Sequence, residues 1–280
     1  MKKAIKKLTM ERFHSVNGVD SPELVLTERE VTTYNKKGIP VRTDYEQFEF
    51  DNFWENYTGV KLYDDSGRVI SSNYDGRISE FSYEDSAEGG WIEKDHRDIG
   101  EKFESSSMTV YDTDGKTISW EQIGKDGSTG GFEYKYDNKG RRIEMISYTD
   151  GKVDSRIVTE YDDINENEYF CRDKCYYKKN DITRFHADRV IIEGGTKTIT
   201  SYDYDADMNL VPFSKEVIVT CIDEDGKEQY LHEDLWMKGE HIWEYIYEYA
   251  GGDFNACTTI EKRFDQDYWT KEVIEVEYWD

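Results

Sequence analysis

The feature that most constrains the fold of this chain is a repeated pattern of Tyr, then Asp or Asn, two variable residues and Gly. Complete copies occupy residues 34–38, 63–67, 111–115 and 136–140, and degenerate copies begin at Tyr161 and Tyr202. The Asp or Asn side chain can cap a tight turn through the backbone, and the Gly supplies the left-handed conformation that precedes a return strand. The pattern therefore predicts β-hairpins, with Gly67, Gly115 and Gly140 at chain reversals.

The segments between these turns alternate in character, as strands half-buried in a sheet do. Between residues 243 and 249, Trp and Tyr at odd positions oppose Glu244 and Glu248. The tyrosines at 111, 136 and 161 are 25 residues apart, so each unit is expected to hold two strands and two turns. We predict an all-β fold, an extended antiparallel sheet of repeated hairpins, with little helix. The best helix candidate is the first dozen residues.

No change in composition marks a linker along the 280 residues. We therefore predict a single β-repeat domain over residues 1–280. Within it, residues 1–30 are expected to form an N-terminal segment, residues 31–230 the repeat sheet, and residues 231–280 a set of aromatic-rich terminal strands.

The Tyr-Asp-x-x-Gly-Arg/Lys frame at residues 63–68, 111–116 and 136–141 resembles the YD repeats of Rhs and teneurin-like proteins and of many shorter bacterial proteins. The chain is too short to enclose a toxin, as the large Rhs shells do. The resemblance implies a short, stand-alone repeat sheet, a form found among surface proteins and near polymorphic toxin loci, where compact acidic partners act as immunity proteins. The family has no shared catalytic residues to carry over.

The charge balance bears on the partner. With 61 acidic and 36 basic residues the net charge is −25, which disfavours nucleic acid and favours a basic protein surface. The basic start lacks the apolar region of a signal peptide, and no later apolar stretch approaches the roughly 20 residues that span a bilayer. Four cysteines are too few for a disulfide framework. We expect a cytoplasmic protein without membrane contact, and the oligomeric state is left open.

Motifs for nucleotide binding, zinc proteases and serine hydrolases are missing from the sequence. We therefore expect no enzyme, no cofactor and no metal site. One alternative stays open around His232, Asp234 and His241, which could form a metal or acid–base site rather than an ordinary turn surface.

Three aspartates, Asp203, Asp205 and Asp207, resemble the opening of a calcium loop. Met208 stands where the sharp turn of an EF-hand needs Gly, and Ser214 stands where it needs a bidentate Glu. The EF-hand is excluded, and a looser calcium site competes with an acidic hairpin turn.

Large aromatic residues concentrate in residues 236–280. The predicted partner-binding residues are Trp236, Trp243, Tyr245, Tyr247 and Trp269, with the acidic Asp203, Asp205 and Asp207. The alternative is that the rings form a core against the rest of the sheet. Together these features favour a non-catalytic immunity protein that neutralises a toxin by occluding its basic active site or surface. A repeat scaffold or a carbohydrate-binding surface-type protein is the alternative function, and an enzyme ranks last.

Overall fold

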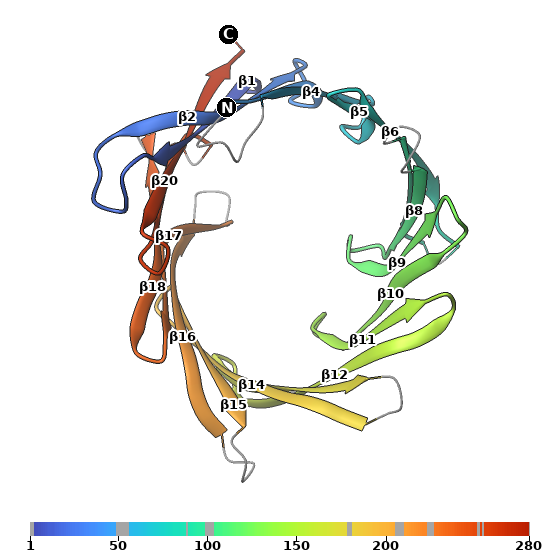
Figure 1. The fold of residues 1–280 in the computed structure, drawn as a ribbon, viewed down its shortest axis with the longest axis vertical. Helices are drawn as coiled ribbons and strands as arrows, with labels where there is room; N and C mark the ends of the chain where they lie inside the picture. Colours follow the sequence, from blue (N-terminus) through green and yellow to red (C-terminus); the bar gives the residue numbers. More distant parts are fainter. Residues whose placement is uncertain are drawn as a thin grey trace. The chain divides into compact units, whose positions relative to one another are not determined.

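Antiparallel strands make up the regular structure of this chain, as the alternating sequence predicts. The computed structural model describes residues 3–48, 56–87, 89–98, 104–177, 181–204, 210–222, 227–250, 253 and 255–279. Within these residues twenty strands join one sheet and no α-helix occurs (Figure 1). The predicted all-β, antiparallel class is therefore confirmed. Over the same residues, no helix has the length and apolar character needed to cross a bilayer.

The strands follow one another along the chain with short connections. They are β1 (Ile5–Ser15), β2 (Leu24–Tyr34), β3 (Pro40–Gln47), β4 (Tyr57–Tyr63), β5 (Val69–Tyr74), β6 (Arg77–Asp85), β7 (Trp91–Asp98), β8 (Glu104–Tyr111), β9 (Thr117–Gly124), β10 (Thr129–Tyr136), β11 (Arg142–Thr149), β12 (Lys152–Asn165), β13 (Glu168–Tyr177), β14 (Asp181–Glu193), β15 (Thr196–Tyr204), β16 (Leu210–Ile222), β17 (Glu228–Met237), β18 (Glu240–Tyr249), β19 (Cys257–Arg263) and β20 (Tyr268–Tyr278).

The predicted turn chemistry is confirmed. Gly67, Gly115 and Gly140 lie at chain reversals with φ of 86°, 81° and 75°. Asp137 closes its turn through its side chain, whose Oδ1 accepts the backbone N–H groups of Lys139 and Arg141, both at 2.9 Å. These hydrogen bonds favour the charged carboxylate, and the one from the backbone N–H of Arg141 has the largest effect. The pKa of Asp137 therefore lies below its usual value.

The predicted extended sheet of hairpins is wrong, because the first and last strands pair with each other. β1 runs antiparallel to β20, from Ile5 opposite Tyr278 to His14 opposite Thr270, and it pairs with β2 on its other side. Each later strand pairs with the next, so the pairing of the described strands closes on itself. Closure gives hydrogen-bond partners to backbone groups that an edge strand would expose. In place of the predicted helix over the first dozen residues, β1 begins at Ile5, and its pairing with β20 and β2 favours the strand.

Contacts divide the chain into two compact units. The first comprises Met1–Val69, Arg189–Ser201 and Pro212–Asp280, and the second comprises Ile70–Asp188 and Tyr202–Val211. The first unit holds β1 to β4 and β17 to β20, and the sites described below belong to it.

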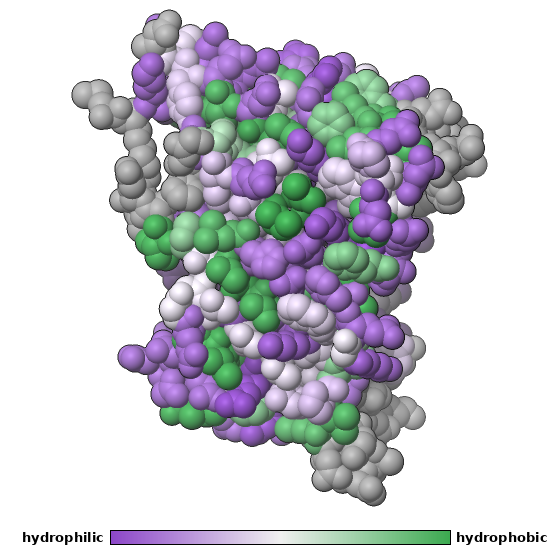
Figure 2. Space-filling model, turned by 90° about the vertical axis from the view of Figure 1, so that its left-hand side faces the viewer, coloured by the Kyte–Doolittle hydropathy of each residue, from purple (hydrophilic) through white to green (hydrophobic). Residues whose placement is uncertain are grey.

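Strand register sorts the side chains of the first unit onto two faces. We call the side of β18, β19, β20, β1 and β2 that carries Tyr245 and Tyr247 the tyrosine face. Polar residues are buried there, including Glu28 and Thr270, which are 7% and 8% exposed. The other side is the opposite face, where charged residues such as Lys262 are prominent. In Figure 2 the hydrophobic residues of the described chain are scattered among hydrophilic ones, without a continuous apolar band on the side drawn.

Candidate functional site

A cavity of about 420 Å³ opens on the tyrosine face of the first unit, and we call it the tyrosine cavity. It is lined from β1, β2, β18, β19 and β20. Its aromatic and acidic lining consists of Tyr245, Tyr247, Tyr268, Glu28, Glu261 and Glu272. Arg12 and His14 supply the basic groups of the lining.

Strand pairing brings these residues together in rows that cross the sheet. In one row Tyr247 of β18 faces Thr259 of β19, and Thr259 faces Glu272 of β20. The row continues across the closure, where Glu272 faces Arg12 of β1 and Arg12 faces Glu28 of β2. Directly facing side chains in an antiparallel sheet lie close enough to interact. The cavity lining therefore depends on the pairing of β1 with β20.

Arg12 links two carboxylates across three strands. Its guanidinium donates to Oε2 of Glu28 at 3.0 Å and to Oε2 of Glu272 at 2.7 Å. Although burial alone would lower the pKa of Arg12, the hydrogen bond to Glu272 and the charges of both glutamates raise it overall. The Glu28 side chain is only 9% exposed and that of Glu272 is 22% exposed, so water can replace Arg12 as a partner less readily at Glu28 than at Glu272.

The tyrosines of the cavity remain protonated at neutral pH. Burial, followed by the hydrogen bond and charge of Glu261, raises the pKa of Tyr245 to about 12. Burial and the neighbouring Glu233 also raise the pKa of Tyr247, whose hydroxyl donates to Glu233 at 2.7 Å. The rings of Tyr245 and Tyr247 stack with centroids 6.5 Å apart. They therefore present neutral aromatic surface beside carboxylates.

The second row of the cavity joins Tyr245, Glu261, Thr270 and His14. Glu261 accepts a hydrogen bond from Nε of Arg263 at 2.5 Å and one from the Thr270 hydroxyl at 3.4 Å. Burial, and then the charge of Arg12, lower the pKa of His14. Because a lowered pKa favours the neutral imidazole, His14 adds no positive charge at neutral pH.

This lining can hold a positively charged group. Tyrosine faces attract cations through the ring quadrupole, and carboxylates form charge-assisted hydrogen bonds with ammonium and guanidinium groups. Three carboxylates, Glu28, Glu261 and Glu272, stand against the guanidinium groups of Arg12 and Arg263, so three negative charges minus two positive charges leave one negative.

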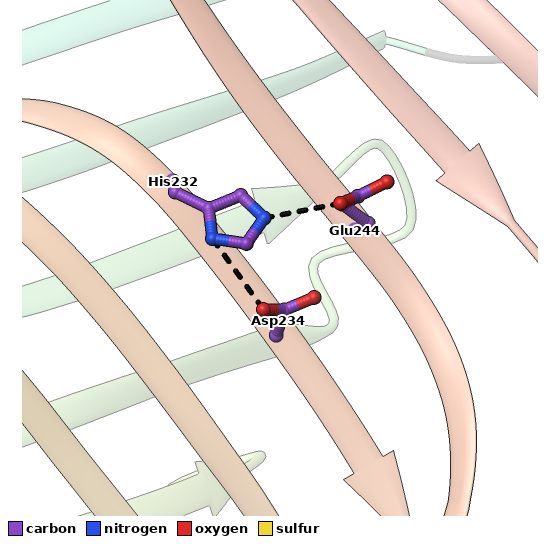
Figure 3. A group of neighbouring side chains, drawn as sticks. All are labelled: His232, Asp234 and Glu244. Carbon is purple, nitrogen blue, oxygen red and sulfur yellow. Dashed lines mark hydrogen bonds and ion pairs between the residues drawn. The ribbon is translucent and has the colours of Figure 1, made fainter.

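A second group of titratable side chains lies on the opposite face, at β17 and β18. It consists of His232, Asp234 and Glu244, which can each offer one ligand atom within 4.8 Å of the others (Figure 3). Glu244 also accepts from Nζ of Lys262 at 2.9 Å, and Asp234 lies 2.8 Å from Nε2 of His241. We call these three residues the His232 cluster. It overlaps the predicted His232, Asp234 and His241 neighbourhood, with Glu244 as the member that sequence reasoning placed only among strand charges.

The predicted partner-binding aromatics divide between the two faces. Tyr245 and Tyr247 line the tyrosine cavity, and Trp243 meets Tyr245 edge to face at 4.9 Å. Trp236 lies on the opposite face, where it stacks on His241 with centroids 5.0 Å apart. Trp269 also lies there and donates its indole N–H to the carbonyl of Ser21 at 2.8 Å.

Of the predicted acidic residues the structure describes Asp203, which does not join either site. Oδ1 of Asp203 in β15 lies 3.8 Å from Nδ1 of His186. Asp205 and Asp207 lie outside the described residues. A partner-binding role for the acidic and aromatic sets stays a prediction.

Sequence reasoning missed the residues that complete the tyrosine cavity, namely Arg12, His14, Glu28, Glu261 and Glu272. Residues 1–30 were expected to form a separate segment outside the repeat sheet. One signal was present in the sequence. Leu8, Met10, Arg12 and His14 stand at every second position, so they would share one face if this segment were a strand. Their neighbours in β20 are identified only by the closing pair of strands.

Comparison with known proteins gives fold likenesses only. No family model matches the chain, and no curated protein matches it. A porin-like protein from Bacteroides uniformis aligns over 99% of both chains, with 10% identity and a TM-score of 0.39. The outer membrane channel DcaP of Acinetobacter baumannii aligns over 98% of this chain and 96% of its own, with 9% identity and a TM-score of 0.19. At these values neither description is carried over to this chain.

These findings overturn the predicted family and role. The two structures described are porin-like and an outer membrane channel, and neither is a YD-repeat protein or an immunity protein. The predictions of Rhs-like membership, toxin neutralisation, a basic toxin partner, a cytoplasmic location and no membrane contact are therefore wrong, and the scaffold or carbohydrate-binding alternative fits no better. The physical reason is that Tyr-Asp-x-x-Gly encodes a tight antiparallel turn, which proteins of many families use.

Proposed function

We propose that the tyrosine cavity of this chain binds a small organic cation. The observation that carries the proposal is the gathering of three glutamates and three tyrosine rings around one cavity of about 420 Å³. Small-molecule sites in proteins commonly measure about 300–1,000 Å³ and combine aromatic walls with a few placed polar groups. A ligand with an ammonium or guanidinium head and a short apolar body matches both parts of this lining.

Charge supports the same ligand class. With the tyrosines and His14 neutral, the cavity keeps one uncompensated carboxylate, and a monovalent head group would balance it. The chain as a whole carries −25, which raises the local concentration of cations and slows the approach of anions.

Calorimetric titration tests the proposal. Spermidine and choline serve as cationic probes, and citrate and glycerol serve as anionic and neutral controls. We expect one cationic probe to bind with an affinity that falls as salt rises, and the controls to give no heat. Binding of citrate in preference to both cations would contradict the proposal.

Two matched substitutions, one on β20 and one on β18, localise the binding. Glu272→Gln removes a cavity carboxylate and is expected to weaken binding about tenfold or more, since a charge-assisted hydrogen bond contributes about 1.5–3 kcal/mol. Glu248→Gln removes the same charge from an exposed position that pairs with Thr258 on the opposite face, and it should leave binding unchanged. Equal loss in both variants would assign the effect to overall charge.

A second candidate, passage of small solutes, is favoured by the closed pairing. Closed antiparallel sheets of about 16–18 strands leave an aqueous channel in porins. The opposite face of β19 and β20 carries Lys262 and Lys271, and each Lys facing lipid near a bilayer midplane would cost about 2–4 kcal/mol. Solute-induced swelling of liposomes reconstituted with the protein tests this candidate, and we rank it below ligand binding.

A further inference from the structure

We propose that the His232 cluster, formed by His232, Asp234 and Glu244, binds a divalent transition-metal ion, with Zn²⁺ as the best fit. The site lies on the opposite face from the tyrosine cavity and shares no residue with it. It therefore goes beyond the proposed cation binding and stands independently of it. It also departs from the expectation of no metal site.

The register of β17 and β18 assembles the three ligands. Asp234 faces Glu244 directly, and His232 faces Ile246 on the same side of the sheet. His232 and Asp234 are two residues apart on one strand, so their side chains point to the same face. Two adjacent strands thus fix all three positions without any loop.

The contacts of His232 point to a cation. Its Nδ1 lies 3.4 Å from Oδ2 of Asp234, and its Nε2 lies 3.2 Å from Oε1 of Glu244, so the ring stands between two carboxylates (Figure 3). A neutral imidazole has one N–H, which it can donate to only one of them. The other nitrogen then presents a lone pair to a carboxylate oxygen, and a metal ion beside that nitrogen removes the repulsion.

One distance between ligand atoms and the donor types suit zinc. Ligand atoms held about 2.0–2.1 Å from a tetrahedral ion are about 3.3 Å apart, close to the 3.2 Å between His232 Nε2 and Glu244 Oε1. One imidazole and two carboxylates form a three-ligand set that leaves the fourth position to water. Imidazole disfavours the hard ions Mg²⁺ and Ca²⁺, which prefer oxygen ligands throughout.

Neighbouring residues support the carboxylates. His241 contacts Oδ1 of Asp234 at 2.8 Å and is itself packed against Trp236 and Phe264, with ring centroids 5.0 Å and 4.6 Å away. Lys262 holds Oε2 of Glu244 at 2.9 Å and leaves Oε1 directed at His232. Such outer contacts orient ligands in metal sites. The Asp234 side chain is 13% exposed and that of Glu244 is 20% exposed, so both are partly shielded from water.

The test is a calorimetric titration. The full chain is first treated with a chelator to remove bound metal and is then titrated with ZnCl₂. We expect one Zn²⁺ per chain at pH 7.5 and at least tenfold weaker binding at pH 5.5, where protons compete for the imidazole. Asp234→Asn and Glu244→Gln keep the size of each side chain, and His232→Ala removes the nitrogen. Each is expected to weaken zinc binding at least tenfold.

His96→Ala is the matched control, because His96 is an exposed histidine of β7 in the second unit. Circular dichroism of each variant establishes that the sheet is retained. Because Asn and Gln replacements preserve shape, they keep the test decisive if His232→Ala fails to fold. Zinc binding that survives both isosteric changes, or the absence of stoichiometric zinc in the unaltered chain, would overturn the proposal.

Discussion

Substitution of Arg12 by Met tests the electrostatics of the tyrosine cavity. The change removes the guanidinium that contacts Glu28 at 3.0 Å and Glu272 at 2.7 Å, while keeping much of the side-chain volume. The Glu28 side chain, 9% exposed, would then be a buried carboxylate without its cation. Breaking a buried pair in this way costs about 3–5 kcal/mol.

The exposed fractions set the expected magnitude. Because the Arg12 side chain is 39% exposed and that of Glu272 is 22% exposed, solvent screens part of the interaction. We therefore expect Arg12→Met to lower the free energy of unfolding by about 2–3 kcal/mol, below the fully buried range. Urea denaturation followed by tryptophan fluorescence measures this loss, as a lower midpoint at an unchanged slope.

Two further variants make the reasoning refutable. Arg42→Met removes an exposed guanidinium that pairs with Asp44 on the opposite face, where the side chains are 54% and 46% exposed. It should leave the free energy of unfolding essentially unchanged, because solvent screens an exposed ion pair. Adding Glu28→Gln to Arg12→Met should recover much of the loss, because the uncompensated charge is gone. Equal effects of Arg12→Met and Arg42→Met would refute the account of a buried charge network.

Three other substitutions give separate expectations. Lys135, followed by Arg156, holds the pKa of Glu144 below its usual value, so the contribution of Glu144 is present above about pH 4.3 and is lost as the pH falls through the lowered pKa. Glu144→Gln should cost about 1–2 kcal/mol at pH 7 in urea melts, and the difference from the unaltered chain should vanish once the pH has fallen past the lowered pKa. Gly38→Ala should cost about 1 kcal/mol by thermal unfolding, since φ is 77° and an added Cβ meets nothing within 4 Å; a neutral effect would count against the left-handed turn. Thr43→Val should cost about 1–3 kcal/mol in the same assay, because Thr43 is 1% exposed and its hydroxyl is hydrogen-bonded to the hydroxyls of Thr32 and Tyr63. Unchanged stability would exclude those hydrogen bonds.

Local structure was predictable because it depends on neighbouring residues. The Asp or Asn and Gly of each turn act within five residues, so Asp137 and Gly140 behave as their sequence indicates. Alternation in residues 243–249 likewise gave the shared face of Trp243, Tyr245 and Tyr247, since strand period is two wherever the strand is regular.

Long-range structure was not predictable from these patterns. Arg12 and Glu272 are 260 residues apart, and turn motifs carry no information on which strand meets β1. The register shift between Leu235 and Trp236 was also not predicted, although it places His241 opposite Trp236, on the face away from Tyr245. A β-bulge of this kind depends on pairing and not on composition. The sequence therefore predicted the tyrosines of the candidate site but not the charged residues that contact them.

Hydrogen exchange of backbone amides, resolved by residue with NMR, tests the closure of the sheet most directly, and the tyrosine cavity depends on that closure. Because β1 pairs with both β2 and β20, amides throughout Leu8 to His14 should be protected, and so should those of Val273 and Ile274. An open sheet would leave every second amide of β1 and of β20 without a partner. Fast exchange at alternate positions in both strands would contradict the account, and uniform protection would support it.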